Sequence, residues 1–205
     1  MCSNGTLSQT IVNHPVNANE FLINHDFKLL WCNIFKSAST TWMYNFVALK
    51  GHSKKDVKKS HKKVIEFARK NDYPRPSWQE LKPVLYNENF TSFIVVREPF
   101  ERLLSSYSDK ILDRSDNFYN NVRCRMKKNC KPEFADFVDF IAREVNAGRR
   151  LDEHWSPYAT FCSPCLAKYD YILHFEKLHG EEKCFINQVS FCFLKKMTNI
   201  LNIIQ

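Results

Sequence analysis

Two short apolar runs, each followed directly by helix-start residues, constrain the fold of this chain more than any other feature. The first, 28–35 (K-L-L-W-C-N-I-F), is rich in strand formers. It precedes Ser37–Thr41, which offers several N-cap candidates, and a helix that Gly51 ends. The second, Ser92–Val96, precedes Pro99, a residue favoured in the first turn of a helix. Buried strands that alternate with helices predict an α/β fold with a central parallel sheet flanked by helices.

The rest of the chain is expected to add helices around this sheet and one further strand. At 205 residues, the chain has the length of a single domain. The expected elements are a helix at 53–70 that ends before Pro74 and Pro76, one or two helical turns at 78–85, a helix at 99–112, an amphipathic helix at 134–147 closed by Gly148, a strand at 169–175, and a helix or tail at 176–205.

Glycine is scarce, which excludes the common glycine-built nucleotide loops. Only four glycines occur among 205 residues, and none lies in a G-x-G-x-x-G or G-x-x-x-x-G-K-[ST] pattern.

The formal net charge of +8 indicates a polyanionic partner. Composition leaves open whether this partner is nucleic acid, a membrane surface or an acidic polysaccharide. No run of 18 apolar residues and no signal-peptide pattern is visible, so the sequence predicts no membrane span in this chain and no targeting segment.

The loop after the first strand has the chemistry of an anion site. A loop between a strand end and a helix N-terminus presents unpaired backbone N–H groups and the positive end of the helix dipole. In 35–42 (F-K-S-A-S-T-T-W), Lys36 adds a mobile positive charge and the hydroxyl side chains add donors, so the loop can hold a phosphate without glycine. The alternative is that these residues only cap a helix.

A second candidate anion-binding residue follows the second strand. Arg97 comes at the carboxyl end of that strand, where open α/β sheets place their ligands, and a guanidinium can bind a phosphate through two hydrogen bonds. Ser105 lies eight residues further on, about two helical turns away, where its hydroxyl can reach the same phosphate. The alternative is a surface ion pair of Arg97 with Glu98 or Glu101.

Three ordered motifs together resemble the Golgi carbohydrate sulfotransferases, specifically the chondroitin/dermatan 4-O-sulfotransferase group. They are F-K-S-A-S-T-T-W at 35–42, V-R-E-P-F-E-R-L-L-S-S-Y-S-D-K at 96–110, and D-E-H-W at 152–155 followed by C-S-P-C at 162–165 and Y-D-Y-I at 169–172. The resemblance covers about residues 25–180. It implies a P-loop-like sulfotransferase fold. Phe35 stands where that family usually has proline.

The resemblance also implies a co-substrate, 3′-phosphoadenosine 5′-phosphosulfate, and no metal. Arg97 and Ser105 would hold its 3′-phosphate, and Lys36 would act in catalysis by neutralising the leaving oxygen. The residues that would surround the 5′-phosphosulfate are Phe35, Lys36, Ser37, Ala38, Ser39, Thr40 and Thr41. Sulfuryl transfer, like phosphoryl transfer, depends mainly on positioning and on charge stabilisation, which fits these residue types.

The reaction also needs a general base for the acceptor hydroxyl, and His154 is the candidate. It lies in the family-like E-H-W run, beside Glu153, which could orient it. The alternative is a structural histidine packed against Trp155. His52 and His61 lie between the two cofactor motifs and are further candidates for this role.

A lysine-rich run, 52–63, suggests an acceptor-binding track. It contains six lysines at helical spacing, and a plain solvated helix face is the alternative. Because no aromatic residue or arginine lies among these charges, the sequence argues against nucleic acid and favours an acidic, chondroitin- or dermatan-like polysaccharide as partner.

The cysteines and two N-x-[ST] sequons, 4–6 and 89–91, fit a glycoprotein of an oxidising compartment. By resemblance, Cys162 and Cys165 form disulfides, with partners that the sequence does not identify. Cys124 and Cys130 can bridge a loop, Cys32 is expected to be a small core residue, and one C-x-x-C is a weak zinc signal. The resemblance places the protein in the Golgi lumen or at the Golgi membrane, to which the family is anchored.

The predicted function is sulfuryl transfer to a glycosaminoglycan-type sugar, the 4-hydroxyl of N-acetylgalactosamine in chondroitin or dermatan. The predicted organisation is a loose lead-in at 1–20, a sulfotransferase domain at 21–180 and a divergent tail at 181–205, and we expect the chain to be truncated at both ends. The main alternative is a truncated, non-catalytic polyanion-binding pseudoenzyme of the same fold. A nucleotide kinase is disfavoured because no Walker pattern occurs.

Overall fold

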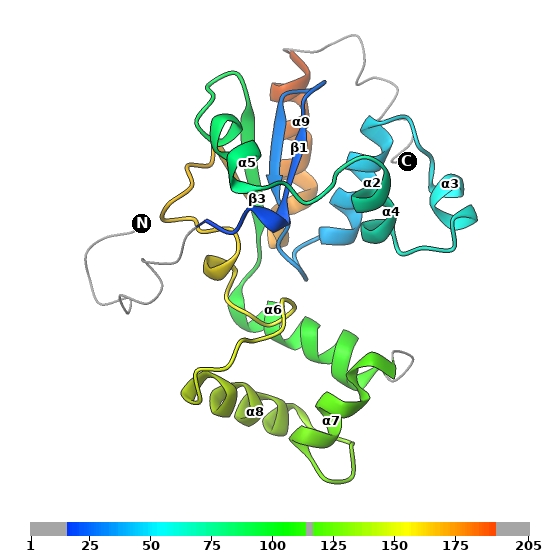
Figure 1. Cartoon of the computed structure of the whole chain (residues 1–205), viewed down its shortest axis with the longest axis vertical. Coiled ribbons are helices and arrows are strands. Elements are labelled where there is room, and N and C mark those ends of the chain that lie inside the picture. Colours follow the sequence, from blue (N-terminus) through cyan, green and yellow to red (C-terminus); the bar gives the residue numbers. More distant parts are fainter. Residues whose placement is uncertain (1–15, 114–116, 192–205) are drawn as a thin grey trace. The chain divides into compact units, whose positions relative to one another are not determined.

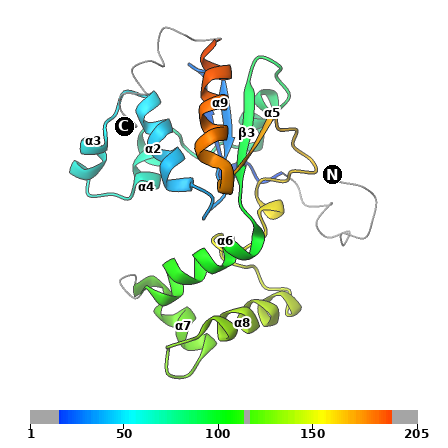
Figure 2. The same ribbon diagram turned by 180° about the vertical axis from the view of Figure 1, so that it is seen from behind.

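The computed structural model describes residues 16–113 and 117–191, and these form two compact units. The sheet unit consists of the described residues up to Val96 and from Tyr158 onwards, and the helical unit of Arg97–Pro157. Figure 1 shows the elements of each unit, and Figure 2 shows them from behind. The fold class predicted from the sequence is confirmed, because a mixed α/β unit with a largely parallel sheet is present.

The sheet unit contains the predicted strands and helices and one strand that the sequence did not predict. The short 3-10 helices are η1 (Ala18–Glu20), η4 (Tyr158–Thr160) and η5 (Phe175–Lys177). The strands are β1 (Phe21–Asn24), β2 (Leu29–Cys32), β3 (Thr91–Val96) and β4 (Tyr171–His174). The α-helices are α2 (Ser39–Leu49), α3 (Lys54–Lys59), α4 (Val64–Asn71), α5 (Trp78–Leu85) and α9 (Leu178–Phe191).

The four strands lie in the order β1-β2-β3-β4. β2, β3 and β4 are parallel, in the register Trp31 to Phe93 and Ile94 to Ile172. β1 pairs antiparallel with β2 and forms the edge that the sequence analysis missed. It is only four residues long and ends at Asn24, a residue that is depleted in strands. Asn24 is fully buried and donates to the Tyr73 hydroxyl at 2.7 Å, so tertiary contacts stabilise this strand end.

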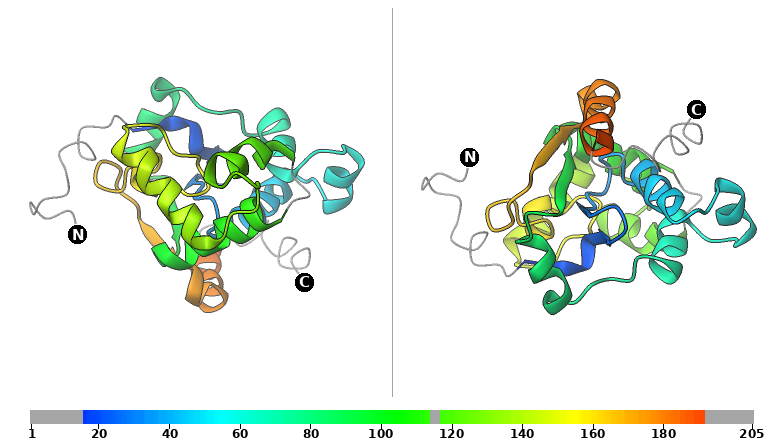
Figure 3. Two further views of the ribbon diagram at one scale, coloured as in Figure 1. Left: turned by 90° about the horizontal axis from the view of Figure 1, so that it is seen from below. Right: turned by 90° about the horizontal axis from the view of Figure 1, so that it is seen from above.

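Side chains of β2 and β3 alternate between two hydrophobic cores, one on each face of the sheet. Trp31 and Phe93 face the core formed with α2, α4 and α9. Leu30 and Ile94 face the core formed with α5 and the 158–167 segment. Figure 3 shows α9 and α5 on opposite faces of the sheet. Burial on both faces explains why these strands are continuous apolar runs in the sequence.

The helix expected at 53–70 forms as two helices, α3 and α4. The Ser60 hydroxyl donates to the Val57 carbonyl at 2.7 Å and accepts from the Lys62 N–H at 3.3 Å, and such local bonds compete with helix continuation. His61 then adopts a φ of 55°, which ends the helical path. Gly51, after α2, has a φ of 85°, as expected of a residue that ends a helix.

Two disulfides close loops of very different length. Cys32 is a buried core residue, as expected, but it also bonds to Cys162, 130 residues away. The predicted local bridge from Cys124 to Cys130 is confirmed. Cys165 is also disulfide-bonded. Within the described ranges, no cluster of three or more His, Cys, Asp or Glu side chains could hold a metal ion, and no helix is long and apolar enough to cross a membrane.

The helical unit packs around an aromatic core of its own. Its elements are α6 (Pro99–Ser106), the π-helix η2 (Tyr107–Leu112), the 3-10 helix η3 (Asn117–Tyr119), α7 (Asn120–Met126) and α8 (Phe134–Asn146). Tyr107, Phe137 and Trp155 are buried together in its core. Gly148 follows α8 with a φ of 64° and closes it, as predicted.

The helix predicted at 99–112 forms, but its last turns widen into the π-helix η2. Arg123 of α7 stabilises the end of η2. The Arg123 side chain, 1% exposed, donates to the carbonyls of Lys110, Ile111 and Asp113 at 2.6–3.1 Å. These bonds satisfy carbonyls that a helix end leaves unpaired, and they also satisfy the buried guanidinium.

Candidate active site

The β2–α2 loop, Asn33–Ala38, adopts a backbone that usually requires glycine. Lys36 has a φ of 67° and Ala38 a φ of 58°, both in the left-handed region that L-residues seldom adopt. Turns of this kind point successive N–H groups into a concave, anion-binding arrangement. The loop therefore has the backbone of a phosphate loop although it contains no glycine.

The N-terminus of α2 has no side-chain cap, whereas those of α3 and α5 do. Ala38 occupies its N-cap position and has no side-chain acceptor, and no acidic residue lies in the first turn. In α3 and α5, by contrast, Ser53 and Ser77 form capping boxes with Asp56 and Glu80. The sequence alternative, in which the serines and threonines of this segment merely cap α2, is therefore wrong at the N-cap position. The N–H groups in the first turn of α2, at the positive end of the helix dipole, are therefore available to an anion.

Ser37 provides the clearest sign that the loop takes a ligand. Its side chain is 1% exposed, and its Oγ has no hydrogen-bond partner among residues 16–113 and 117–191. A buried hydroxyl without a partner costs free energy of about 1–3 kcal/mol, which a bound oxyanion would offset. Lys36 beside it is half-buried. These groups fit the 5′-phosphosulfate of the expected co-substrate.

The other predicted loop residues fall into two groups. Phe35 is buried, and Ala38 and Ser39 are half-buried, whereas Thr40 and Thr41 are exposed in the first turn of α2. Trp42, which ends the motif, is a core residue. Its ring packs against Phe93 at a centroid distance of 4.7 Å and against Phe185 of α9 at 5.9 Å. Trp42 thus fixes α2 on the sheet.

The predicted 3′-phosphate residues, Arg97 and Ser105, lie in the helical unit. Arg97 directly follows Val96, the last residue of β3, and its side chain is 17% exposed. Its Nη2 lies 3.7 Å from Oε2 of Glu101, so the surface ion pair considered as an alternative is present. Exposed pairs of this kind contribute little, about 0–1 kcal/mol, and do not prevent phosphate binding. Ser105 is half-buried on α6.

His154, the candidate base, also lies in the helical unit and is held by Asp152. Its Nδ1 lies 2.7 Å from Oδ1 of Asp152, and its backbone N–H donates to the same oxygen at 2.9 Å. The Tyr119 hydroxyl lies 3.2 Å from Nδ1 and donates to Oδ2 of Asp152 at 3.3 Å. These contacts place the carboxylate of Asp152 next to the ring, and they leave the expectation that Glu153 orients His154 untested.

These contacts set the charge of Asp152 and the tautomer of His154. Burial alone would raise the pKa of Asp152, but hydrogen bonds from the His154 ring, the His154 backbone and Tyr119 outweigh it and hold this pKa below the ordinary 3.8. An ionised carboxylate only accepts hydrogen bonds, so it assigns the ring proton to Nδ1. In a neutral ring, Nε2 then carries the lone pair, as a general base requires.

Two residues that the sequence analysis did not single out hold the segment around His154. Arg102, 5% exposed, donates to the carbonyls of Glu153 and Ser156 at 3.1 and 2.9 Å. The Ser106 hydroxyl lies 2.5 Å from the His154 carbonyl. Both residues belong to the second motif, at i and i+4 on α6. That spacing on one helix face is the signal that could have identified them.

The two reserve histidines are placed differently. Nε2 of His52 lies 3.3 Å from Oδ1 of Asp72, and its ring contacts Phe67 edge-on at 5.2 Å. His61 is exposed between α3 and α4. The structure thus keeps Phe35–Thr41 together in the sheet unit, in the β2–α2 loop and the first turn of α2, while Arg97, Ser105 and His154 belong to the helical unit.

The β2–α2 loop and Arg97, which follows β3, carry two of the motifs that resemble a sulfotransferase. A family model, the sulfotransferase family, matches residues 19–193. The chain therefore belongs to the sulfotransferase family. The match spans both units, and it includes α9 as far as the structure describes it, beyond the boundary expected at residue 180.

Carbohydrate sulfotransferases are among the relatives that match, which confirms the resemblance to the carbohydrate sulfotransferases as a whole. Carbohydrate sulfotransferase 8 of Homo sapiens is 24% identical over 193 residues, covering 85% of this chain and 44% of the relative. Carbohydrate sulfotransferase 10 of Rattus norvegicus is 28% identical over 171 residues, covering 75% and 48%. Carbohydrate sulfotransferase 14 of Danio rerio is 27% identical over 183 residues, covering 82% and 47%. The chain thus spans about half the length of these relatives, and no solved structure matches it at comparable significance.

Proposed function

We propose that this chain transfers a sulfuryl group from 3′-phosphoadenosine 5′-phosphosulfate to a hydroxyl of a glycosaminoglycan-type sugar, specifically the 4-hydroxyl of N-acetylgalactosamine in chondroitin or dermatan. The observation that carries this proposal is the β2–α2 loop, in which the buried Ser37 hydroxyl, beside Lys36 at the uncapped N-terminus of α2, has no hydrogen-bond partner within the described ranges. Membership of the sulfotransferase family supports the reaction, and the motifs quoted above support the acceptor.

The loop residues bind the donor and stabilise the leaving group. The N–H groups of the first turn of α2 and the Ser37 hydroxyl point donors at the 5′-phosphosulfate, and Lys36 neutralises the charge that develops on the leaving oxygen. Preorganised donors at such a position act in the transition state without further reorganisation. Arg97 and Ser105 hold the 3′-phosphate. The bound co-substrate supplies the sulfuryl group.

His154 takes the proton of the acceptor hydroxyl. Asp152 accepts the hydrogen bond from Nδ1 at 2.7 Å and so keeps the lone pair on Nε2. When Nε2 receives the proton, the same carboxylate stabilises the imidazolium. Asp152 is thus a positioning residue, and Tyr119 fixes the carboxylate in turn.

We place the protein in the Golgi lumen. The disulfides Cys32–Cys162 and Cys124–Cys130 support an oxidising compartment. Asn89 of the second sequon is exposed in the turn before β3, where a glycan could be attached, while the first sequon lies outside the described residues. A non-catalytic polyanion-binding pseudoenzyme of the same fold is the second candidate, which the formal net charge of +8 favours.

Transfer of labelled sulfate to desulfated chondroitin and dermatan tests the proposal. We expect the 205-residue chain to catalyse transfer, and Lys36→Ala to reduce kcat by about 10²-fold or more, since one stabilising charge at the reacting centre is lost. Arg97→Ala is expected mainly to weaken binding of adenosine 3′,5′-bisphosphate. Lys82→Ala, an exposed lysine of α5, is the control. Binding of the nucleotide without any transfer would favour the pseudoenzyme. The absence of both binding and transfer would exclude the proposed function.

A further inference from the structure

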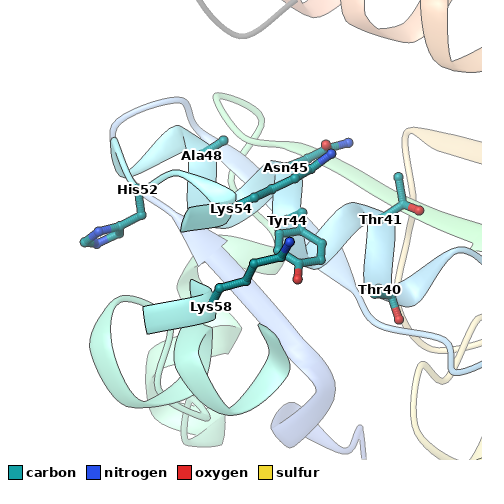
Figure 4. Close-up of a pocket in the computed structure, with 8 residues that line it drawn as sticks. All are labelled: Thr40, Thr41, Tyr44, Asn45, Ala48, His52, Lys54 and Lys58. Carbon is teal, nitrogen blue, oxygen red and sulfur yellow. The ribbon is translucent and has the colours of Figure 1, made fainter. Parts of the chain in front are cut away.

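The outer side of α2 and the neighbouring α3 line a pocket of about 410 Å³ in the sheet unit. Figure 4 shows how its side chains lie, with the lysines extending from α3 towards α2 and the His52 ring pointing away from them. Thr40 and Thr41 lie at its other end, in the first turn of α2. The lining residues are Thr40, Thr41, Tyr44, Asn45, Ala48, His52, Lys54 and Lys58.

The pocket is positively charged, and its charges are uncompensated in the part of the chain that the structure describes. Lys54 and Lys58 are exposed and form no ion pair with any described residue. They lie at i and i+4 on α3, where like charges repel and destabilise the helix slightly. No described carboxylate lines the pocket. A bound anion would therefore relieve an existing repulsion.

The remaining lining groups suit a sugar. The Lys54 Nζ lies 6.0 Å from the centre of the Tyr44 ring, so a cation and an aromatic face occur side by side. Hydroxyls of Thr40 and Thr41 and the Asn45 amide add hydrogen-bonding groups of the kind that fix the orientation of a polar ligand. The Asn45 amide also donates to the Glu182 carboxyl at 3.4 Å, and burial raises the pKa of that carboxyl.

We propose that this pocket binds an anionic sugar unit of the acceptor, through the carboxylate or sulfate that Lys54 and Lys58 face, and so sets the position of the chain that is sulfated. The assignment rests on the proposed function, because the pocket begins at Thr40 and Thr41 in the first turn of α2, the last of the residues expected to surround the 5′-phosphosulfate. A sugar held there reaches the first turn of α2, where the sulfuryl group would lie. Within the lysine-rich run 52–63, Lys54 and Lys58 then bind the acceptor at one defined site, and the other lysines of the run do not take part.

Calorimetric binding of a desulfated chondroitin hexasaccharide, measured without donor, tests this site. We expect the double variant Lys54→Ala/Lys58→Ala to weaken binding at least fivefold. Lys55→Ala/Lys59→Ala is the matched control, because it removes the same charge at the same spacing from the same helix, outside the pocket lining. That control is expected to change binding less than twofold.

Two further sugars identify the anion that the lysines bind. A carboxyl-reduced, unsulfated hexasaccharide is expected to bind the native chain and Lys54→Ala/Lys58→Ala equally. If a carboxyl-reduced, 4-sulfated hexasaccharide binds the native chain more tightly than the variant, the lysines contact sulfate. If only the desulfated chondroitin hexasaccharide binds the native chain more tightly, the lysines contact carboxylate.

The outcomes separate this site from the reaction. Equal losses in the two lysine pairs, or no measurable binding by the native chain, would overturn the pocket assignment even if sulfate transfer occurs. A selective loss in Lys54→Ala/Lys58→Ala without any transfer would keep the pocket and refute the transferase. Unchanged adenosine 3′,5′-bisphosphate binding and unfolding temperature are expected in both variants, which excludes misfolding as the cause.

Discussion

At the scale of single residues, the β2–α2 loop, which we propose as the donor site, adopts a strained backbone without glycine. Lys36 and Ala38 adopt left-handed φ values of 67° and 58°, each at a cost of about 1–3 kcal/mol for a non-glycine residue. The buried Ser37 hydroxyl, which has no hydrogen-bond partner among the described residues, adds a further cost. Strain and unsatisfied polar groups concentrate at functional sites, because there the ligand completes the structure.

Asp152 gives the sharpest prediction at this scale. Asp152→Asn is expected to lower kcat by about 10²-fold with little change in the donor KM, because an amide no longer fixes the proton on Nδ1 of His154. The pH–rate profile is expected to lose the limb that reports the base. Initial rates across pH 5–9 measure both effects.

Matched variants decide whether Asp152 acts through His154. Asp139→Asn, an exposed aspartate of α8, is the neutral control, and Asp152→Glu should restore part of the rate. If Glu153→Gln caused the loss and Asp152→Asn did not, the original expectation about Glu153 would be correct. The sequence could not identify Asp152, since a contact from i to i+2 depends on the turn, and no periodic pattern reports that turn.

At the scale of elements, the strands were the most predictable part and their ends the least. β2 and β3 were predicted because both of their faces are buried, which leaves an unmistakable apolar run. The division of 53–70 into α3 and α4 was missed, because it depends on hydroxyl contacts of Ser60 with nearby backbone. The edge strand β1 was missed because its stability comes from pairing with β2.

Helix α9 shows that the chain beyond residue 178 is part of the fold, since Phe185 and Val189 are buried in the core with α2. Its Glu182 is half-buried and accepts from Asn45 at 3.4 Å. Burial raises the pKa of this carboxyl above 4.5, so the folded state binds a proton more tightly than the unfolded state. The stability of the fold therefore falls as the pH rises through this pKa, because the ionised group is poorly solvated.

Glu182→Gln is expected to stabilise the protein at neutral pH by removing that charge while keeping the amide contact. The unfolding temperature should rise on the order of 2 °C at pH 7 and stay unchanged near pH 4, where the native carboxyl is protonated. Thermal unfolding at the two pH values measures the difference. Glu181→Gln is the neighbouring control, and it should behave in the opposite sense, since hydrogen bonds from His174 lower the pKa of Glu181. If Glu182→Gln raised the unfolding temperature equally at both pH values, the ionised carboxyl would not be the cause.

At the scale of the whole molecule, a covalent link joins segments that the chain order separates widely. Cys32 ends β2, directly before the β2–α2 loop, and Cys162 lies in the 158–167 segment. Both residues are buried in the core that this segment forms with α5. The motifs indicated that Cys162 forms a disulfide, but not its partner, because pairing depends on which elements lie side by side. The fold class, by contrast, followed from strand and helix order alone.

The two disulfides are therefore expected to differ in their effect on stability. In the chain-entropy description, Cys32–Cys162, with a sequence separation of 130, contributes about 5 kcal/mol, and Cys124–Cys130, with a separation of 6, contributes about 2 kcal/mol. Each of the variants Cys32→Ala/Cys162→Ala and Cys124→Ala/Cys130→Ala removes two cysteines. Denaturant unfolding of the two variants therefore compares the two disulfides directly. Equal losses would show that loop closure does not determine the contribution. Because Cys32 immediately precedes the loop of Lys36 and Ser37, the first variant should also weaken adenosine 3′,5′-bisphosphate binding, which the second should leave unchanged.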